Sequence, residues 1–189
     1  MFRLGYRLAF ETKPKKKNWT DIFNLWLFAA RGGHIRAQFY LGTCYDNGYG
    51  TEKDLQLAFH WYLKAAKAGH RDAQYNVGFF FASDELGIKN NKKKVFWYSK
   101  AANAGLIDGQ RDLGYSYFYG EGIKRDEKKA VYWYKKAASK NDEKAFYNLG
   151  LCYKHGDGVD QSNRWAKHYF EQAKKYGHKE AIKELRKLT

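Results

Sequence analysis

The sequence is poor in proline and cysteine, and it has no long apolar run. Its 189 residues include one proline and two cysteines. Two cysteines are too few for a disulfide scaffold, so we expect a reducing compartment and a cytoplasmic location. Charged residues fall throughout the chain, so no stretch of about 18 apolar residues is present to span a bilayer. The segment from Met1 to Lys17 lacks an apolar stretch before a small-residue cleavage site, which argues against a secretory signal.

Acidic residues are scarce relative to basic ones. Lys and Arg number 35 against 20 Asp and Glu, which gives a formal net charge of +15. A charge of this size suggests an anionic partner. Aromatic residues are abundant by contrast, with 6 Trp, 16 Tyr and 13 Phe, and a disordered chain is poor in these residues.

A pattern with a period of 36 residues organises the chain. An apolar residue followed by glycine recurs at residues 41–42, 77–78, 113–114 and 149–150, and an aromatic pair recurs at 61–62, 97–98, 133–134 and 169–170. We therefore divide the chain into four full repeats, residues 37–72, 73–108, 109–144 and 145–180. Residues 1–36 are interpreted as a degenerate N-terminal capping repeat, and residues 181–189 as a C-terminal capping helix of one continuous solenoid domain.

Each repeat is predicted to contain two helices. The first ends at a Gly-x-Gly turn, such as residues 48–50, because paired glycines allow the positive backbone angles of a tight turn. The second begins after an N-cap residue, which is Asp54, Asn90, Asp126 or Ser162 in the successive repeats. It closes at Gly69, Gly105, Asn141 or Gly177, and Asn is the usual substitute for Gly in a left-handed C-cap.

Three places depart from the pattern. In the second repeat the glycine pair is replaced by Asp84 to Gly87, and we expect the same turn there with an altered backbone. In the first 36 residues the pair Leu4-Gly5 is one residue out of register, and a basic stretch, residues 13–17, replaces the turn. Near the other end Arg186 replaces the glycine that would let a following helix approach.

The pattern Ala-x-x-x-Leu-Gly-x-x-Tyr, Gly-x-Gly, Asp, then Ala-x-x-Trp-Tyr-x-Lys-Ala-Ala-x-x-Gly is most complete from Gly109 to Asn141 and from Ala37 to Gly69. It resembles the Sel1-like repeat, a relative of the tetratricopeptide repeat, over residues 37–180. The resemblance implies an all-α fold, namely an α/α superhelix: a right-handed solenoid of antiparallel helix pairs whose first helices line the concave surface. It also implies a non-enzymatic adaptor that binds proteins or peptides, as bacterial members do in signalling, host interaction and assembly of complexes.

The resemblance also implies a binding surface. First-helix positions that flank the Leu-Gly pair face the groove in related repeats, and here they are Phe39, Tyr40, Thr43, Tyr75, Asn76, Phe79, Arg111, Asp112, Tyr115, Tyr147, Asn148 and Leu151. The residue before Leu or Val is often an Asn that binds a peptide backbone. Asn76 and Asn148 match it, whereas Tyr40 and Asp112 do not. The alternative interpretation is that several of these rings pack between neighbouring repeats.

Cysteine and tryptophan favour structural interpretations. Some secreted members of the family carry a cysteine pair within each repeat, but Cys44 and Cys152 occupy one equivalent position three repeats apart. Helices that pack about 8–10 Å apart place such residues beyond the roughly 7 Å Cα limit of a disulfide, so we expect reduced core residues. The second-helix tryptophans, Trp61, Trp97 and Trp133, share one register and are interpreted as packing between repeats.

The positive charge has two interpretations. Residues 1–36 hold eight basic and two acidic residues, and further lysines cluster at turns and second-helix starts, at residues 92–94, 124–125 and 128–129. These clusters, expected on the convex face, suggest polyanion or nucleic-acid binding as the alternative function. Lysine predominates, however, whereas base readout favours arginine. We favour an acidic protein as the partner, and we expect the chain itself to be a monomer. One hypothesis of this kind is that the chain is an immunity protein that neutralises a cognate toxin.

No catalytic constellation is found. The chain has no phosphate-binding G-x-x-x-x-G-K-[ST], no G-x-S-x-G and no H-E-x-x-H motif. His34, His70 and His178 occupy one equivalent position of the repeat, and repetition explains them without a metal. We therefore expect neither enzymatic activity, nor a cofactor, nor a metal site.

Overall fold

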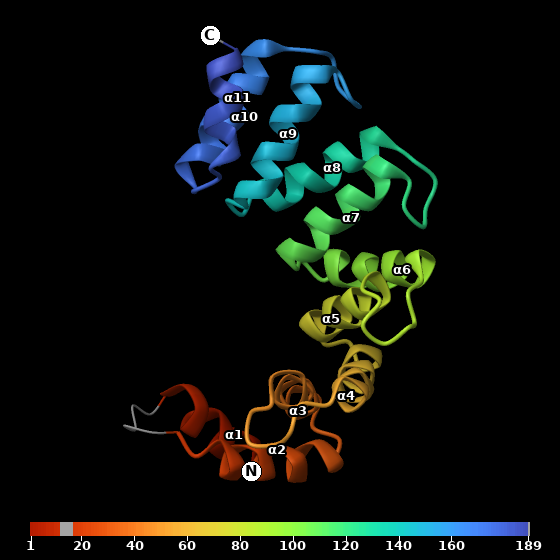
Figure 1. Ribbon diagram of the computed structural model, residues 1–189, viewed down its shortest axis with the longest axis vertical. Helices are drawn as coiled ribbons and strands as arrows, with labels where there is room; N and C mark the ends of the chain where they lie inside the picture. The colour runs from red at the N-terminus through yellow and green to blue at the C-terminus, as the bar shows by residue number, and fades with distance from the viewer. Residues whose placement is uncertain (12–16, 189) are drawn as a thin grey trace. The chain divides into compact units, whose positions relative to one another are not determined.

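A computed structural model describes residues 1–11 and 17–188 of the chain, and within them it is all helical (Figure 1). The all-α expectation is thus confirmed. The chain divides into two compact units, residues 1–89 and 90–189, and this division falls inside the second repeat. Most of the basic stretch, residues 13–16, lies outside the described residues. Every helix in the described part of the chain is too short or too polar to cross a membrane.

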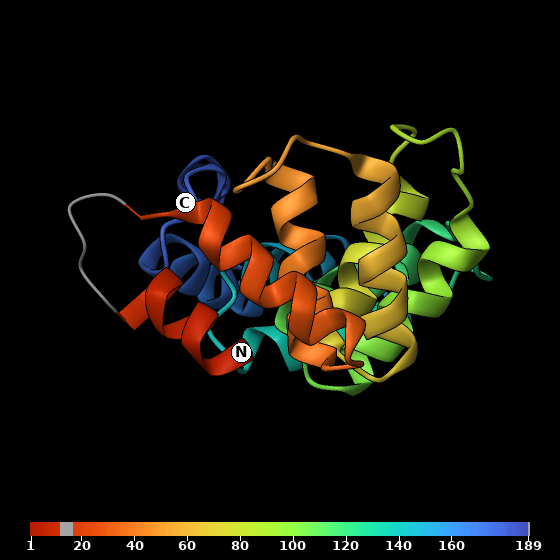
Figure 2. The same ribbon diagram turned by 90° about the horizontal axis from the view of Figure 1, so that it is seen from below.

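Among its described residues, the first unit has six helical segments. They are α1 (Phe2–Tyr6), a π-helix η1 (Arg7–Glu11), α2 (Trp19–Arg31), α3 (Ile35–Asn47), α4 (Leu55–Lys67) and α5 (Arg71–Ala82). Consecutive helices lie side by side, and Figure 2 shows the first helical segment beside α2. The second unit contains α6 (Asn91–Asn103), α7 (Ile107–Tyr119), α8 (Glu127–Ala138), α9 (Glu143–His155), α10 (Asn163–Lys175) and α11 (Glu180–Lys187).

The predicted helix caps are confirmed. The side chains of Asp54, Asn90, Asp126 and Ser162 each accept a hydrogen bond from the backbone N–H three residues further on. Asn141, with φ of 64°, is the one non-glycine residue of positive φ in the described part of the chain. Capping depends on neighbours in sequence, which is why the pattern predicts it.

The glycine of the Leu-Gly pair is a contact point between helices. A Cβ atom on Gly42 would lie 2.7 Å from the ring of Tyr62, and one on Gly114 would lie 2.7 Å from the ring of Tyr134. The two helices of a repeat therefore approach through a glycine on one and an aromatic ring on the other. Gly150 with Phe170 and Gly5 with Trp26 repeat the arrangement.

The pair formed by Gly5 and Trp26 explains the register shift near the N-terminus. Leu4-Gly5 is one residue out of register, yet Gly5 contacts the ring that corresponds to Tyr62. The segment that follows, Arg7–Glu11, is a π-helix. A π-helical turn accommodates one extra residue within a helix, so α1 and η1 together serve as the first helix of the degenerate repeat.

The turn of the second repeat differs more than expected. Helix α5 ends in an extended residue, Ser83, at φ −79° and ψ 166°, whereas α3, α7 and α9 end in left-handed glycines. In the other repeats the second glycine of the turn lies against the preceding repeat: a Cβ atom on Gly158 would be 2.5 Å from the backbone of Glu127. Leu86 occupies this position in the second repeat, so its side chain excludes the same turn.

The repeated tryptophans and both cysteines are buried. Trp61 is 8 % exposed and packs with Ile22, Trp26 and Leu41, while Trp133 is 9 % exposed and packs with Val95 and Leu113. Each of these two tryptophans thus contacts the preceding repeat, as the sequence predicts. Cys44 and Cys152 are free thiols that are 0 % and 1 % exposed.

Candidate functional site

The predicted groove residues occupy the accessible side of the first helices. They lie on α3 (Phe39, Tyr40 and Thr43), α5 (Tyr75, Asn76 and Phe79), α7 (Arg111, Asp112 and Tyr115) and α9 (Tyr147, Asn148 and Leu151). All twelve are half-buried or exposed, whereas the adjacent core residues Leu41, Val77, Leu113 and Leu149 are buried. Phe79 and Tyr115 are the most open of the set, at 50 % and 44 % exposure.

Two polar members in the first unit are engaged within the fold. The buried hydroxyl of Tyr62 lies 3.3 Å from Oγ1 of Thr43 and 3.2 Å from a carboxylate oxygen of Asp46. The side chain of Asn76 also hydrogen-bonds Tyr62, and burial raises the pKa of this tyrosine. Thr43 and Asn76 therefore help to satisfy a buried hydroxyl, which competes with any role in holding a ligand.

The aromatic members on α3 are also packed internally. The ring of Tyr40 stacks on Trp26 with centroids 4.8 Å apart, and the rings of Phe2, Tyr6 and Phe10 surround it. Phe39 stacks on His70 at 4.5 Å. Tyr40 therefore packs between neighbouring repeats, as in the alternative interpretation, whereas Phe39 packs against the end of its own repeat.

A histidine before the first helix has a role that the sequence reasoning missed. His34 and His70 accept hydrogen bonds through Nδ1 from the backbone N–H groups of Ala37 and Ala73, and each imidazole also stacks on a ring of the preceding first helix. Burial lowers the pKa of His70, with the positive charges of Arg36 and Arg71 acting in the same direction and Asp72 opposing them. The period of 36 between His34 and His70 was the available signal.

Arg111 is the centre of an ion-pair network. Its guanidinium lies 2.8 Å from Asp108, 3.0 Å from Asp112 and 3.0 Å from Asp142, and only 13 % of its side chain is exposed. These carboxylates raise the pKa of Arg111 above its ordinary value although burial opposes the rise. The predicted residues Arg111 and Asp112 therefore bind each other, and three carboxylates around one guanidinium leave local negative charge.

The second unit brings predicted residues together at a cleft. A hollow of about 420 Å³ is lined by Lys144 and His178 with four predicted residues, Arg111, Asp112, Tyr115 and Asn148. A smaller neighbouring hollow shares Tyr115 and Asn148 and adds Leu151. The ring of Tyr115 lies 4.4 Å from that of Tyr119, so two exposed tyrosines form one wall.

Asn148 differs from its equivalent in the first unit. Its side-chain amide makes no hydrogen bond to any residue that the structure describes. The reason lies in its surroundings, because the positions that Thr43 and Asp46 hold in the first repeat are taken by Tyr115 and Phe118 in the third repeat, which precedes that of Asn148. A half-buried amide between two hollows can donate to a carbonyl and accept from an N–H of an extended chain.

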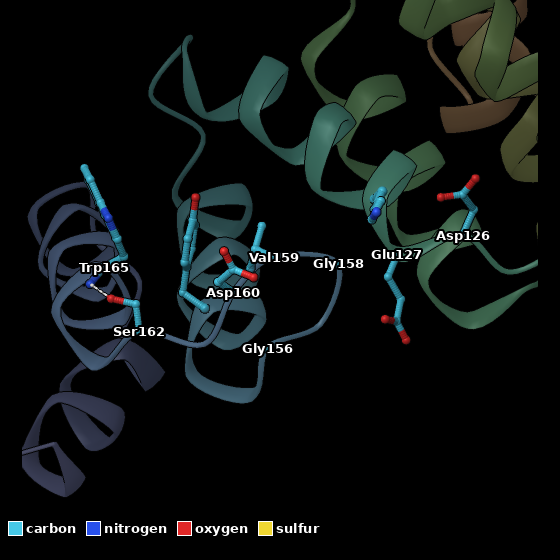
Figure 3. A pocket seen from close by; sticks show the side chains of 10 residues that line it. Asp126, Glu127, Gly156, Gly158, Val159, Asp160, Ser162 and Trp165 are labelled. Atoms are coloured by element: carbon cyan, nitrogen blue, oxygen red, sulfur yellow. Dashed lines mark hydrogen bonds between the residues drawn. The ribbon is translucent and has the colours of Figure 1, made fainter.

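A third hollow, of about 750 Å³, lies at the turn between α9 and α10 and contains none of the twelve predicted groove residues (Figure 3). Its two carboxylates on α8 already have partners, since Asp126 pairs with Lys129 at 3.3 Å and Glu127 pairs with Arg125. The hydroxyl of Ser162 caps α10 by accepting from the N–H of Trp165. This hollow is therefore built around helix-capping contacts.

One lysine of the basic clusters is buried, while residues 92–93, 124–125 and 128–129 are exposed. Lys94 was placed on the convex face with Lys92 and Lys93, but it is only 5 % exposed and its ammonium lies 2.7 Å from a carboxylate oxygen of Glu121. This expectation was wrong, because Lys94 reaches across to the turn that follows α7. Arg125 and Lys129 also have carboxylate partners.

The Sel1 repeat family model matches four consecutive segments of the chain, residues 35–70, 71–106, 107–142 and 144–178. The chain therefore belongs to the Sel1 repeat family, whose members are α/α solenoids. Sel1 repeats are scaffolds for protein–protein interaction and are typically non-catalytic. No curated protein matches the chain.

Solved structures support this assignment. A Sel1 repeat protein from Oxalobacter formigenes is 32 % identical, with a TM-score of 0.86 over 97 % of this chain and 72 % of that one. A protective antigen of uropathogenic Escherichia coli strains with an SLR fold is 31 % identical, with a TM-score of 0.91, and the match covers 97 % of this chain but only 39 % of the antigen. An immunity protein from Pseudomonas aeruginosa is 26 % identical, with a TM-score of 0.56 over 95 % of this chain and 66 % of that one.

Proposed function

We propose that this chain is a non-enzymatic protein-interaction module that binds an extended segment of a partner protein on its first helices. The observation that carries the proposal is the accessible amide of Asn148, which has no hydrogen-bond partner among the described residues and lies half-buried between two hollows that Tyr115 and Leu151 also line. A peptide backbone satisfies such an amide, and exposed tyrosines anchor interfaces at low entropy cost. In the first unit, Tyr75 and Phe79 on α5 provide the corresponding contacts.

The partner as a whole is acidic in this proposal, because the chain carries a formal charge of +15 and complementary fields accelerate association. The segment that contacts the hollow beside Arg111 is not itself acidic, because the carboxylates there leave local negative charge. The specific form that we favour is a cytoplasmic, monomeric inhibitor that neutralises a toxin. Two features support it: the similarity to an immunity protein from Pseudomonas aeruginosa, and two buried cysteines that remain as free thiols.

Affinity co-purification at moderate salt tests the proposal when wild type and variants are compared side by side. The test variant combines Tyr115→Ala with Asn148→Ala. The control is Tyr132→Ala, which removes a ring of similar exposure (51 %) from the second helix α8. We expect retention of the partner to fall about tenfold or more in the test variant and to stay unchanged in the control. Equal retention by both variants contradicts a site on the first helices.

A further inference from the structure

The first unit contains a hollow of about 910 Å³ at the side of α1 and η1 that the functional proposal does not use. Three arginines line it, Arg3 on α1, Arg7 on η1 and Arg36 on α3, together with the rings of Phe2 and Tyr6. Glu11 is the one carboxylate among its lining residues. The hollow therefore gathers three permanent positive charges against one negative charge.

The arginines of this hollow lack the partners that other arginines of the chain have. Arg111 lies within ion-pair distance of three carboxylates, and Arg125 pairs with Glu127. In the part of the chain that the structure describes, no carboxylate lies within ion-pair distance of Arg3, Arg7 or Arg36. Like charges held close together without counter-charges concentrate a positive potential that an anion relieves.

The guanidinium of Arg36 is held in place by aromatic rings. Its central carbon lies 5.3 Å from the ring centroid of Phe2 and 5.3 Å from that of Tyr6, and it donates one hydrogen bond to Tyr40. Contact with ring faces leaves most of the in-plane N–H donors of a guanidinium available, and these donors match the two oxygens of a carboxylate. A side chain that is already ordered loses less entropy when it binds a ligand.

We propose that this hollow binds carboxylate side chains of an acidic segment in the partner protein. The inference rests on the proposed function in that the acidic segment is taken to belong to that partner. Carboxylates on a polypeptide fit the hollow better than a nucleic acid does, because its three exposed arginines are gathered around one hollow and are not arranged along a stripe. A nucleic-acid backbone requires a continuous basic stripe along an open surface.

The test uses the full chain and a short fluorescein-labelled peptide that alternates glutamate and serine, with a glutamine–serine peptide as its neutral counterpart. Binding is followed by fluorescence anisotropy at an ionic strength of about 0.15 M. The test variant is Arg36→Gln. The matched control is Arg31→Gln, which removes one exposed arginine of the same unit that does not line the hollow. Circular dichroism checks that both variants fold, and Arg7→Gln replaces Arg36→Gln if the latter does not.

We expect Arg36→Gln to weaken binding of the acidic peptide about tenfold and Arg31→Gln to weaken it less than about twofold. The neutral peptide should not bind. Equal losses in the two variants indicate diffuse charge attraction and overturn the proposal. A second result also overturns the proposal: a single-stranded oligonucleotide of equal charge binds more tightly than the acidic peptide, and Arg36→Gln weakens both to the same extent. That result assigns the hollow to nucleic acid.

Co-purification separates this inference from the proposed function. Suppose that peptide binding depends on Arg36 but that no co-purified protein depends on Tyr115 and Asn148 for its retention. This result supports the inference about the hollow and contradicts the proposed function. Retention of such a protein, combined with peptide binding that ignores Arg36, supports the proposed function and overturns the inference about the hollow.

Discussion

Arg111 on α7 donates a hydrogen bond across 3.0 Å to Asp142, the residue that caps α9. The equivalent positions of two other repeats hold stacked rings instead, Phe39 on His70 at 4.5 Å and Tyr147 on His178 at 4.2 Å. One contact between a first helix and the end of the same repeat is thus made either by an ion pair or by an aromatic–imidazole stack. In both forms, a residue of one first helix contacts a residue one or two positions before the next first helix.

Replacing Asp142 by alanine should destabilise the protein by about 2 kcal/mol, because the change removes both the cap of α9 and one carboxylate from Arg111. Urea unfolding measures the loss in free energy. Asp54→Ala removes a helix cap whose carboxylate is not paired with an arginine, so it should lower the free energy of unfolding by about half as much. The double variant Arg111→Tyr with Asp142→His introduces the tyrosine–histidine pair of the last repeat, and it should recover part of the stability that the single change at Asp142 loses. A double variant as unstable as the sum of its two single variants contradicts the equivalence of the two contacts.

Gly114→Ala should destabilise the second unit by about 2–3 kcal/mol. The added methyl group would lie 2.7 Å from the ring of Tyr134, so the helices of the third repeat must separate. Gly32→Ala is the matched control, because φ there is −75° and the nearest atom to an added Cβ lies at 3.4 Å. Thermal unfolding should show a clear loss for Gly114→Ala alone, and similar midpoints for the two variants count against the close approach.

The capping role of His70 predicts a pH dependence. Burial lowers its pKa below the ordinary value of 6.5, so the folded protein favours the neutral imidazole whose Nδ1 accepts the hydrogen bond from Ala73. The unfolded chain binds a proton first as the pH falls, so this contribution to stability is complete above about pH 6.5 and is lost as the pH falls through the lowered pKa.

The variant His70→Asn isolates this contribution, because asparagine caps helices and does not titrate. We expect the free energy of unfolding of wild type to fall more steeply between pH 8 and pH 5 than that of His70→Asn, with these limits chosen to bracket a value of about 6.5. His60→Asn removes an exposed histidine of the same unit and should follow the wild-type profile. Parallel profiles for wild type and His70→Asn would show that the cap is not proton-sensitive.

The two cysteines should be unreactive in the folded protein. Burial raises the pKa of Cys44 and of Cys152 to about 12, so the thiolate that attacks a disulfide reagent is scarce at neutral pH. Titration with a chromogenic disulfide should therefore detect neither thiol in the native protein and both after unfolding in urea. Rapid reaction of one thiol under native conditions contradicts its place in the core.

Much of the fold was predictable because it is built from local and repeated features. The cap at Asp126 and the left-handed Asn141 depend on residues within one helical turn, and the period of 36 multiplies each observation. The end of α5 was less predictable. The side chain of Leu86 prevents the turn found in the other repeats, because there the equivalent glycine lies against the preceding repeat. That contact involves residues remote in sequence, so the local pattern does not reveal it.

The candidate site was only partly predictable for the same reason. Asn76 and Asn148 occupy equivalent positions of the repeat, yet only Asn76 hydrogen-bonds a buried tyrosine hydroxyl. What distinguishes them is the identity of residues on two other helices, such as Thr43 in one repeat and Tyr115 in another. A helical period locates a side chain on a face but does not give the partner that it meets there.

Three ion pairs within the second unit join residues that are close in sequence. Lys94 with Glu121, Lys154 with Glu184 and Arg111 with Asp142 are separated by 27, 30 and 31 positions. Closing loops of this length costs little chain entropy, and topologies made of such contacts fold within about milliseconds or faster. A nascent chain therefore needs only the next stretch of similar length, and not the rest of the chain, to complete these contacts.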